Sequence, residues 1–204
     1  MGSFKHAVCY TIGHSNHTRE RFLALVQAYG ISSVVDVRSQ PHSAFVPHFN
    51  KPAIEEFLVA AGIGYTYMGS RLGGRYTDPA VLFPDGRVNF ALVRQSRRFL
   101  DGMTELIECL RRETRVALLC AEKDPFDCHR FVLLGRSLEE RCFTVTHIID
   151  EENVVTNKQL EEKLLKAYEK RNYQYSFLEP AKTPQELLAE AYELRNKDII
   201  AARR

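Results

Sequence analysis

The sequence predicts an α/β fold, with a mostly parallel five-stranded sheet flanked by helices and a C-terminal helical extension. Short runs rich in β-branched residues alternate along the chain with segments whose apolar residues recur at helical spacing. Strands joined by helices form parallel sheets with right-handed crossovers. Of the 204 residues, 45% are hydrophobic and 26% are charged, which is the composition of an ordinary globular domain.

The predicted strands are short, and Gly13 interrupts the chain directly after the first of them. Thr18 is a typical helix-capping residue and Gly30 a typical helix end, and Asn50 and Gly62 enclose a second helix in the same way. The strands are predicted at residues 7–12, 31–37, 64–68, 115–120 and 142–149. The remaining helices are predicted at residues 92–112, 128 to about 140, 156–170 and from 184 onward.

Residues 1–150 are expected to form the α/β core with the functional site. Residues 151–204 are expected to form a helical extension that packs on the core or on a partner, with a linker near residues 171–182. The net charge of +2 gives only weak support for a nucleic-acid partner. Five cysteines, an odd number, argue against a disulfide framework, and no apolar run is long enough to span a bilayer, so we expect a cytoplasmic protein.

Polar side chains follow each predicted strand, and ligands of parallel sheets bind beyond the carboxyl ends of the strands. His14 suits general acid or base chemistry or a bond to backbone, and these two interpretations stay open. Asp36 and Arg38 lie on one side of their strand and form either an internal ion pair or part of a catalytic site. The residues that follow the strands are His14, Ser15, Asp36, Arg38, Arg71, Gly73, Gly74, Arg75, Glu122, Lys123, Cys128, His129 and Arg130.

The segment 120–130 is the sharpest local signal. Asp127 is placed to cap a helix whose first turn would hold Cys128, His129 and Arg130. A helix start attracts anions and lowers the pKa of a thiol, which would suit Cys128 as a nucleophile, but a small, partly buried packing cysteine is the favoured interpretation, because free cysteines are usually inert. A metal held by Cys120, Cys128 and His129, with His14 or His42 as the missing ligand, is not favoured, because adjacent ligands on one helix fit a single ion poorly and no closely spaced ligand pair is present.

Four motifs together resemble a family. They are Thr11-Ile-Gly-His-Ser15, Val35-Asp-Val-Arg38 with Pro47-x-Phe-Asn50 downstream, Leu72-Gly-Gly-Arg75, and Cys120-Ala-Glu122 followed by Cys128-His-Arg130. In order and spacing they resemble the bacterial and archaeal family called domain of unknown function 488, over roughly residues 8–150. The resemblance implies a shared site at the sheet edge and does not imply a reaction.

The leading hypothesis is an enzyme, such as a hydrolase or a nucleic-acid-processing enzyme, that acts on a phosphate-bearing nucleotide or nucleic acid. The expected catalytic residues are His14, Asp36, Glu122, Cys128 and His129, and the expected substrate-binding residues are Ser15, Arg38, Arg71, Gly73, Gly74, Arg75, Lys123 and Arg130. No cofactor is expected. The alternatives are thiol or metal chemistry at Cys120, Cys128 and His129, and a non-catalytic binding module whose helices from Thr156 onward form a partner or homodimer surface.

Overall fold

The computed structural model describes residues 8–112, 115–172 and 182–201. Most of the expected linker, including Tyr173, Tyr175, Phe177 and Leu178, lies outside these ranges. The fold is α/β, as predicted, and its centre is a sheet of six strands with the order β3-β2-β4-β1-β5-β6. The strands are β1 (Val8–Gly13), β2 (Ser33–Asp36), β3 (Gly64–Tyr67), β4 (Val116–Cys120), β5 (Thr144–Ile148) and β6 (Val154–Thr156).

The first five strands are parallel, and β6 pairs with β5 in the antiparallel direction. This sixth strand is absent from the sequence prediction. The turn that produces it is made by Asp150, whose Oδ1 accepts hydrogen bonds from the backbone N–H groups of Glu152 and Asn153. The turn reverses the chain, so the β-branched run that follows can pair back along β5.

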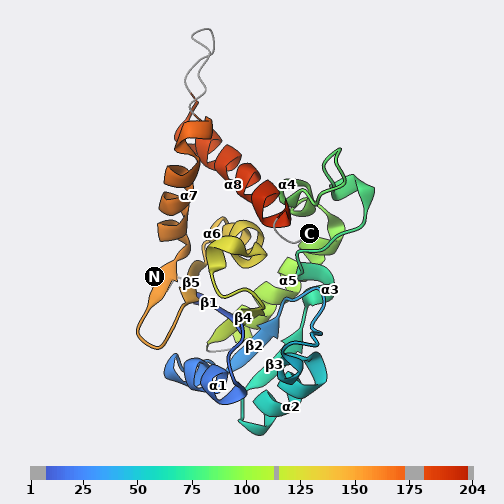
Figure 1. The fold of residues 1–204 in the computed structure, drawn as a ribbon, viewed down its shortest axis with the longest axis vertical. Helices are drawn as coiled ribbons and strands as arrows, with labels where there is room; N and C mark the ends of the chain where they lie inside the picture. The colour runs from blue at the N-terminus through green and yellow to red at the C-terminus, as the bar shows by residue number, and fades with distance from the viewer. Residues whose placement is uncertain (1–7, 113–114, 173–181, 202–204) are drawn as a thin grey trace, which may run out of the picture.

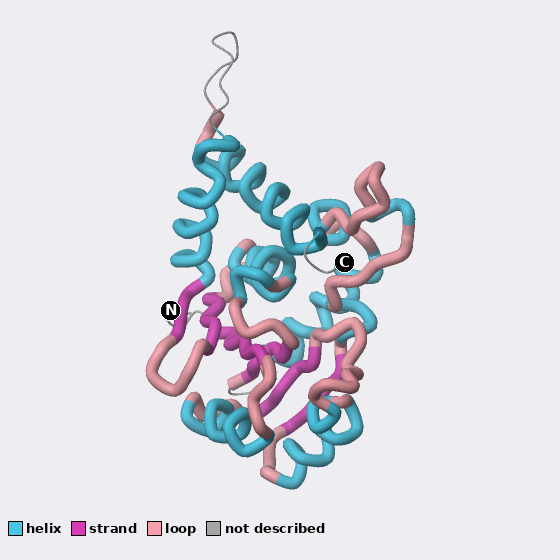
Figure 2. Tube along the Cα trace, viewed as in Figure 1, coloured by secondary structure: helices cyan, strands magenta, loops and turns pink. Residues whose placement is uncertain are grey.

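Helices cover both faces of the sheet (Figures 1 and 2). The α-helices are α1 (Arg19–Ala28), α2 (Lys51–Ala60), α3 (Gly69–Leu72), α4 (Phe90–Val93), α5 (Arg97–Arg112), α6 (Arg136–Glu139), α7 (Asn157–Asn172) and α8 (Pro184–Ala201). The shorter turns are the 3₁₀ segments η1 (Pro47–Phe49), η2 (Pro79–Val81) and η3 (Pro125–Asp127), and η4 (Arg130–Gly135) is π-helical.

Alternation along β4 divides the core into two clusters, because successive side chains of a strand point to opposite faces. Ala117 and Leu119 pack with α1 and α2 in the smaller cluster. Val116 and Leu118 pack on the opposite face, in the larger cluster with α5, η4 and α6. The same alternation directs Cys120 toward the face that η4 covers.

The two C-terminal helices pack on the larger cluster. Leu160 and Leu164 of α7 and Tyr192 and Ile199 of α8 are buried in it. Asn196 of α8 joins the helix to the core, since its side chain accepts a hydrogen bond from the backbone N–H of Phe90 at 2.8 Å and donates one to the carbonyl of Val88 at 3.0 Å. The division of the chain into a core and an extension, and a partner surface on the extension, stay predictions.

Two predicted helices differ from those observed. The helix predicted at residues 92–112 is two helices, α4 and α5, and Ser96 lies between them with its Oγ accepting from the backbone N–H of Phe99 at 3.4 Å. Asp127 does not cap a helix at Cys128, because its carboxylate pairs with Arg195 of α8. Asp124 instead caps η3, and the helical backbone begins only after Cys128.

Within the described residues, no helix is both long and apolar enough to cross a membrane.

The chain leaves neighbouring strands in opposite directions. β1 leads to α1 on one face of the sheet, and β4, its neighbour, leads to η4 and α6 on the other. Connections that diverge in this way open a crevice at the carboxyl ends of the strands. The fold therefore positions a site where β1, β2 and β4 end.

Candidate functional site

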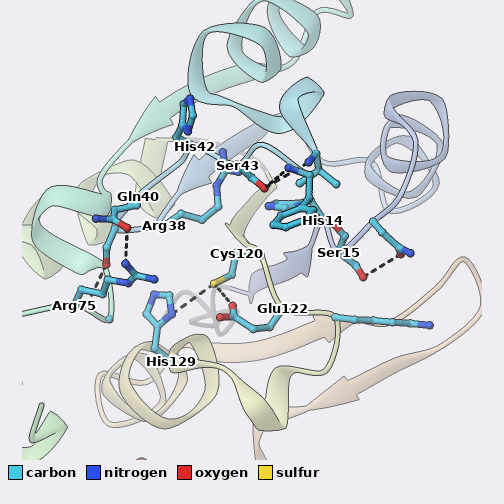
Figure 3. Close-up of a pocket in the computed structure, with 17 residues that line it drawn as sticks. His14, Ser15, Arg38, Gln40, His42, Ser43, Arg75, Cys120, Glu122 and His129 are labelled. Carbon is cyan, nitrogen blue, oxygen red and sulfur yellow. Dashed lines mark hydrogen bonds between the residues drawn. The ribbon is translucent and has the colours of Figure 1, made fainter. Parts of the chain in front are cut away.

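A pocket of about 560 Å³ opens at this edge of the sheet (Figure 3). Its wall comes from the segments that follow β1, β2 and β4, together with the loop around Arg75. The volume lies in the usual range for small-molecule sites. The candidate residues that line it are His14, Ser15, Arg38, Gly74, Arg75, Cys120, Glu122, Lys123 and His129.

The first wall of the pocket is formed by the residues that follow β1 and β4, where backbone hydrogen bonds between the two segments continue beyond the strands. The backbone N–H of His14 donates to the carbonyl of Cys120, and that of Ser15 donates to the carbonyl of Ala121, both at 2.9 Å. Gly13 permits this close approach, since a Cβ atom there would lie 1.9 Å from the carbonyl oxygen of Glu122. Ser15 has a positive φ of 47°, a conformation that a non-glycine residue adopts at some cost and that is common at functional sites.

His14 is almost fully buried and stacks on Phe49, with ring centroids 4.5 Å apart. Its Nδ1 atom donates to the carbonyl of Ser15 at 2.8 Å, which leaves Nε2 as the acceptor. Burial, and then the positive charge of Arg38, lower the pKa of His14 to about 4. The ring is therefore neutral near pH 7.

The second wall rests on an ion pair between Arg38 and Asp36. Asp36 is fully buried, and its two oxygens accept from Nε and NH2 of Arg38 at 2.9 and 2.6 Å. The hydroxyl of Tyr65 donates to the same carboxylate at 2.7 Å, and the third guanidinium nitrogen donates to the carbonyl of Phe49. Asp36 thus fixes the orientation of Arg38 and does not itself line the pocket.

The glycine pair 73–74 brings Arg75 to the pocket. Gly73 packs against Ser39, and Ser39 Oγ accepts from the backbone N–H of Arg75 at 3.0 Å. The Arg75 guanidinium donates to Gln40. Arg71, on the preceding turn, pairs instead with Glu105 of α5, outside the pocket.

A cluster of four side chains lies at the floor of the pocket: Cys120, Glu122 and His129 line it, and Cys128 is buried beneath them. The sulfur atoms of Cys120 and Cys128 are 3.2 Å apart, and Oε2 of Glu122 lies 2.8 and 3.2 Å from them. Nδ1 of His129 is 3.5 Å from the Cys120 sulfur and 3.7 Å from the Cys128 sulfur. The four donor atoms all lie within 4.8 Å of one another. Cys120, Cys128 and His129 are buried, and Glu122 is partly exposed.

The two thiols differ in acidity. Burial raises the pKa of Cys120, but the hydrogen bond from Cys128 and the neighbouring His129 lower it more, to about 6. Burial and the adjacent Cys120 raise the pKa of Cys128. The expectation that a helix start would lower the pKa of Cys128 is wrong, because this residue lies before the helix and beneath the pocket floor.

Arg130 does not reach the pocket. Its side chain is fully buried and makes one hydrogen bond, from NH2 to the carbonyl of Lys123 at 2.6 Å. Across the described residues, Nε and NH1 of Arg130 have no hydrogen-bond partner, and no carboxylate pairs with this guanidinium. The expectation of an anion fork at Arg130 therefore finds no support in its position.

Several pocket residues were not among the predicted site residues. The loop that follows Arg38 contributes Ser39, Gln40, Ser43, Phe45 and Val46. Phe45 is 97% exposed, which is unusual for so large an apolar side chain. The polar, proline-containing character of this loop was the available signal, but it does not say which of its residues face inward.

The fold and the site define an α/β protein with a polar pocket at the carboxyl edge of a mostly parallel sheet. The chain belongs to the family described as "Domain of unknown function DUF488", whose sequence model matches residues 18–136, more than half of the chain. The matched residues include those from Arg38 to Arg130 and exclude His14 and the two C-terminal helices. No curated protein and no solved structure matches the chain.

Proposed function

We propose that this protein is a cytoplasmic enzyme that acts on a phosphate-bearing substrate, with one nucleotide unit held in the pocket at the end of β1, β2 and β4. The observation that carries the proposal is the group of cations Arg38, Arg75 and Lys123 around a floor that contains ionisable side chains. Arginine and lysine are the residues that bind phosphate oxygens most often.

The three cations differ in how far they are neutralised. Arg38 is paired with Asp36, whereas the Arg75 guanidinium, among the described residues, donates to the neutral amide of Gln40. Of the residues that the structure describes, none forms an ion pair with the Lys123 ammonium group. Lys123 and Arg75 therefore contribute positive charge to the lining of the pocket that no carboxylate among the described residues neutralises, and a substrate phosphate would bind to them.

The loop after β2 supplies a surface for the rest of the substrate. Phe45 and Val46 line the pocket beside polar groups such as Ser43 and Gln40. An exposed aromatic ring stacks on a nucleobase, and such stacking contributes about 1–3 kcal/mol per base. A free mononucleotide and the terminal nucleotide of a nucleic acid share this chemistry, and the pocket volume suits either.

The proton-transfer groups are His14 and Glu122. The acceptor nitrogen of His14 is fixed by the hydrogen bond from Nδ1 to Ser15, and Glu122 is the partly exposed member of the floor. Both line the pocket, from the ends of β1 and β4. A general base must lie within hydrogen-bond reach of the proton that it removes, and these positions allow that for a substrate held between Lys123 and Arg75.

Thermal-shift titration with inorganic phosphate, nucleoside monophosphates and short oligonucleotides tests the proposal. Ligand binding to the folded state raises the unfolding temperature, and Lys123→Ala and Arg75→Ala are expected to remove most of that rise. Arg71→Ala is the matched control, because Arg71 lies four residues before Arg75 and pairs outside the pocket with Glu105. Phe45→Ala is expected to weaken the binding of nucleotides and to leave the binding of inorganic phosphate unchanged.

The ligand series also separates the two sources of a nucleotide unit. A response to mononucleotides alone indicates a small-molecule substrate, and a stronger response to oligonucleotides indicates the end of a nucleic acid. If no phosphate compound stabilises the wild type at low salt, or if Arg71→Ala weakens binding as much as Arg75→Ala, the proposed substrate class is wrong.

A further inference from the structure

The cluster at the pocket floor, made of Cys120, Glu122, Cys128 and His129, has the composition and geometry of a metal site. Two sulfurs, one imidazole nitrogen and one carboxylate oxygen converge, and this donor set is typical of zinc. Mg²⁺ and Ca²⁺ prefer oxygen ligands, so a floor with two thiols disfavours them.

The separations between the donor atoms fit one ion. Zinc–sulfur bonds of about 2.3 Å and zinc–nitrogen bonds of about 2.0–2.1 Å at tetrahedral angles place sulfur and nitrogen roughly 3.5 Å apart. His129 Nδ1 lies 3.5 and 3.7 Å from the two sulfurs. The two sulfurs, at 3.2 Å, need to separate by about half an ångström to reach the roughly 3.8 Å that the same geometry requires.

The local backbone explains how two adjacent residues reach one ion. Cys128 is extended, with φ −129° and ψ 147°, and His129 is helical, with φ −61° and ψ −21°. The change of conformation between them directs both side chains to the same point, where Cys120 arrives from the end of β4. Adjacent residues on one helix fit a single ion poorly, but Cys128 is not on the helix, so this constraint does not apply here.

The charges around the floor also favour a cation. Two thiols and a carboxylate lie within 3.2 Å of one another, and they cannot all be ionised without a counter-charge. Two thiolates and one carboxylate around a divalent ion leave a single negative charge. Arg130 follows Cys128 by two residues, its buried guanidinium has no carboxylate partner in the described part of the chain, and its positive charge interacts with the Cys128 thiol. A buried charge without such compensation is costly.

We propose that Cys120, Glu122, Cys128 and His129 bind one divalent ion of the zinc class, with Glu122 as the ligand on the pocket side. Glu122 is partly exposed and lines the pocket, whereas the two cysteines and His129 are buried. Glu122 is therefore the ligand that a water molecule or a substrate anion can replace, and its carboxylate can take part in proton transfer only when it is so replaced. Neither His14 nor His42 is needed in the set. The proposal goes beyond the proposed substrate, because metal binding is measured without any substrate.

Metal analysis of the full-length protein, purified with its thiols reduced, tests the proposal. We expect one zinc ion per chain, and after removal of the metal by a chelator we expect Co²⁺ to bind and to show the absorption of a cobalt–thiolate complex. Cys128→Ser is expected to lower the affinity for Zn²⁺ by more than 10–100-fold, which is the loss that removal of an outer-shell contact causes. Cys142→Ser is the control, because Cys142 is exposed and lies outside the cluster.

Glu122→Gln provides a second variant that leaves the buried part of the site intact. It is expected to keep the cobalt–thiolate absorption and to bind Zn²⁺ more weakly than the wild type but more tightly than Cys128→Ser does, because both thiolates and the imidazole remain. Circular dichroism confirms that each variant is folded. The proposal is overturned if the folded, reduced wild type binds neither Zn²⁺ nor Co²⁺, if Cys128→Ser binds as tightly as the wild type, or if Cys120 and Cys128 form a disulfide in protein purified without oxygen.

Discussion

Replacing Asp36 with asparagine keeps the shape of the side chain and removes its charge from the centre of the fold. Asp36 is fully buried and Arg38 is 7% exposed, so neither group can turn to water when the pair is broken. The carboxylate accepts from the backbone N–H and two guanidinium nitrogens of Arg38, and from the hydroxyl of Tyr65. In the variant, an amide N–H₂ group would face at least one of these donors.

The expected cost follows from this loss of compensation. Removing one partner of a buried ion pair destabilises a protein by about 3–5 kcal/mol, because the remaining charge stays buried. For a chain of this size, 1 kcal/mol corresponds to a change of about 2–4 °C in Tm. Asp36→Asn is therefore expected to lower Tm by about 6–20 °C. Tyr65→Phe removes a single hydrogen bond to the carboxylate, so its expected cost is about 1.5–3 kcal/mol.

Urea unfolding at neutral pH, followed by circular dichroism, measures both variants. Asp85→Asn is the control, since Asp85 also pairs with an arginine two residues away but the pair is largely exposed. That variant is expected to unfold close to the wild-type midpoint. If Asp36→Asn costs less than about 1 kcal/mol while the urea slope is unchanged, the ion pair does not stabilise the second wall of the pocket.

Three further perturbations test other parts of the structure. Burial lowers the pKa of His147 to about 3, so the folded state resists protonation of this ring. The free energy of unfolding therefore decreases as the pH falls below about 6.5, the pKa of histidine in the unfolded chain, and about 2 kcal/mol should be lost by pH 5. His147→Gln should remove that part of the pH dependence, as measured by urea unfolding. Gly13→Ala places a methyl group 1.9 Å from the Glu122 carbonyl and should cost about 1–3 kcal/mol in the same assay; unchanged stability would contradict the close approach of β1 to β4. Deleting residues 183–204 removes Tyr192 and Ile199 from the larger core cluster, and the loss of each buried side chain should lower the free energy of unfolding by about 1.5–3 kcal/mol. A shortened protein with the wild-type Tm would show that α8 does not stabilise the core.

The sequence was sufficient for the fold class because each central strand carries its own signal. The β-branched run around Val34 and Val35 and the apolar run Val116–Cys120 are buried, and both fall within predicted strands. β6 was missed because its three residues precede a helix directly, and their pairing depends on a turn at Asp150 that brings them back to β5. Long-range pairing of this kind is set by tertiary structure and leaves no local pattern.

The candidate site was predictable as far as strand ends could locate it. His14, Arg38 and Glu122 follow β1, β2 and β4, and all three line the pocket. Arg71 and Arg75 are both arginines that follow β3, yet of the two only Arg75 lines the pocket. The chain turns between them at the glycine pair 73–74, and Ser39 holds the backbone of Arg75. Phe45 carried no signal of its own, since an apolar residue in a polar loop is expected to pack and this one is exposed.

The triplet Cys128-His129-Arg130 shows why the chemistry was harder to assign than the position. A helix that began at Cys128 would present all three residues at an anion site in its first turn, and that interpretation made Arg130 a substrate contact. The extended backbone at Cys128 instead directs the cysteine and the histidine to the pocket floor, while the Arg130 side chain is buried and donates to the carbonyl of Lys123. In our proposal, Arg75 and Lys123 at the pocket wall then bind the substrate phosphate, and the charge of Arg130 interacts with Cys128. A single backbone conformation, at Cys128, thus separates the groups expected to bind substrate from those expected to bind a metal.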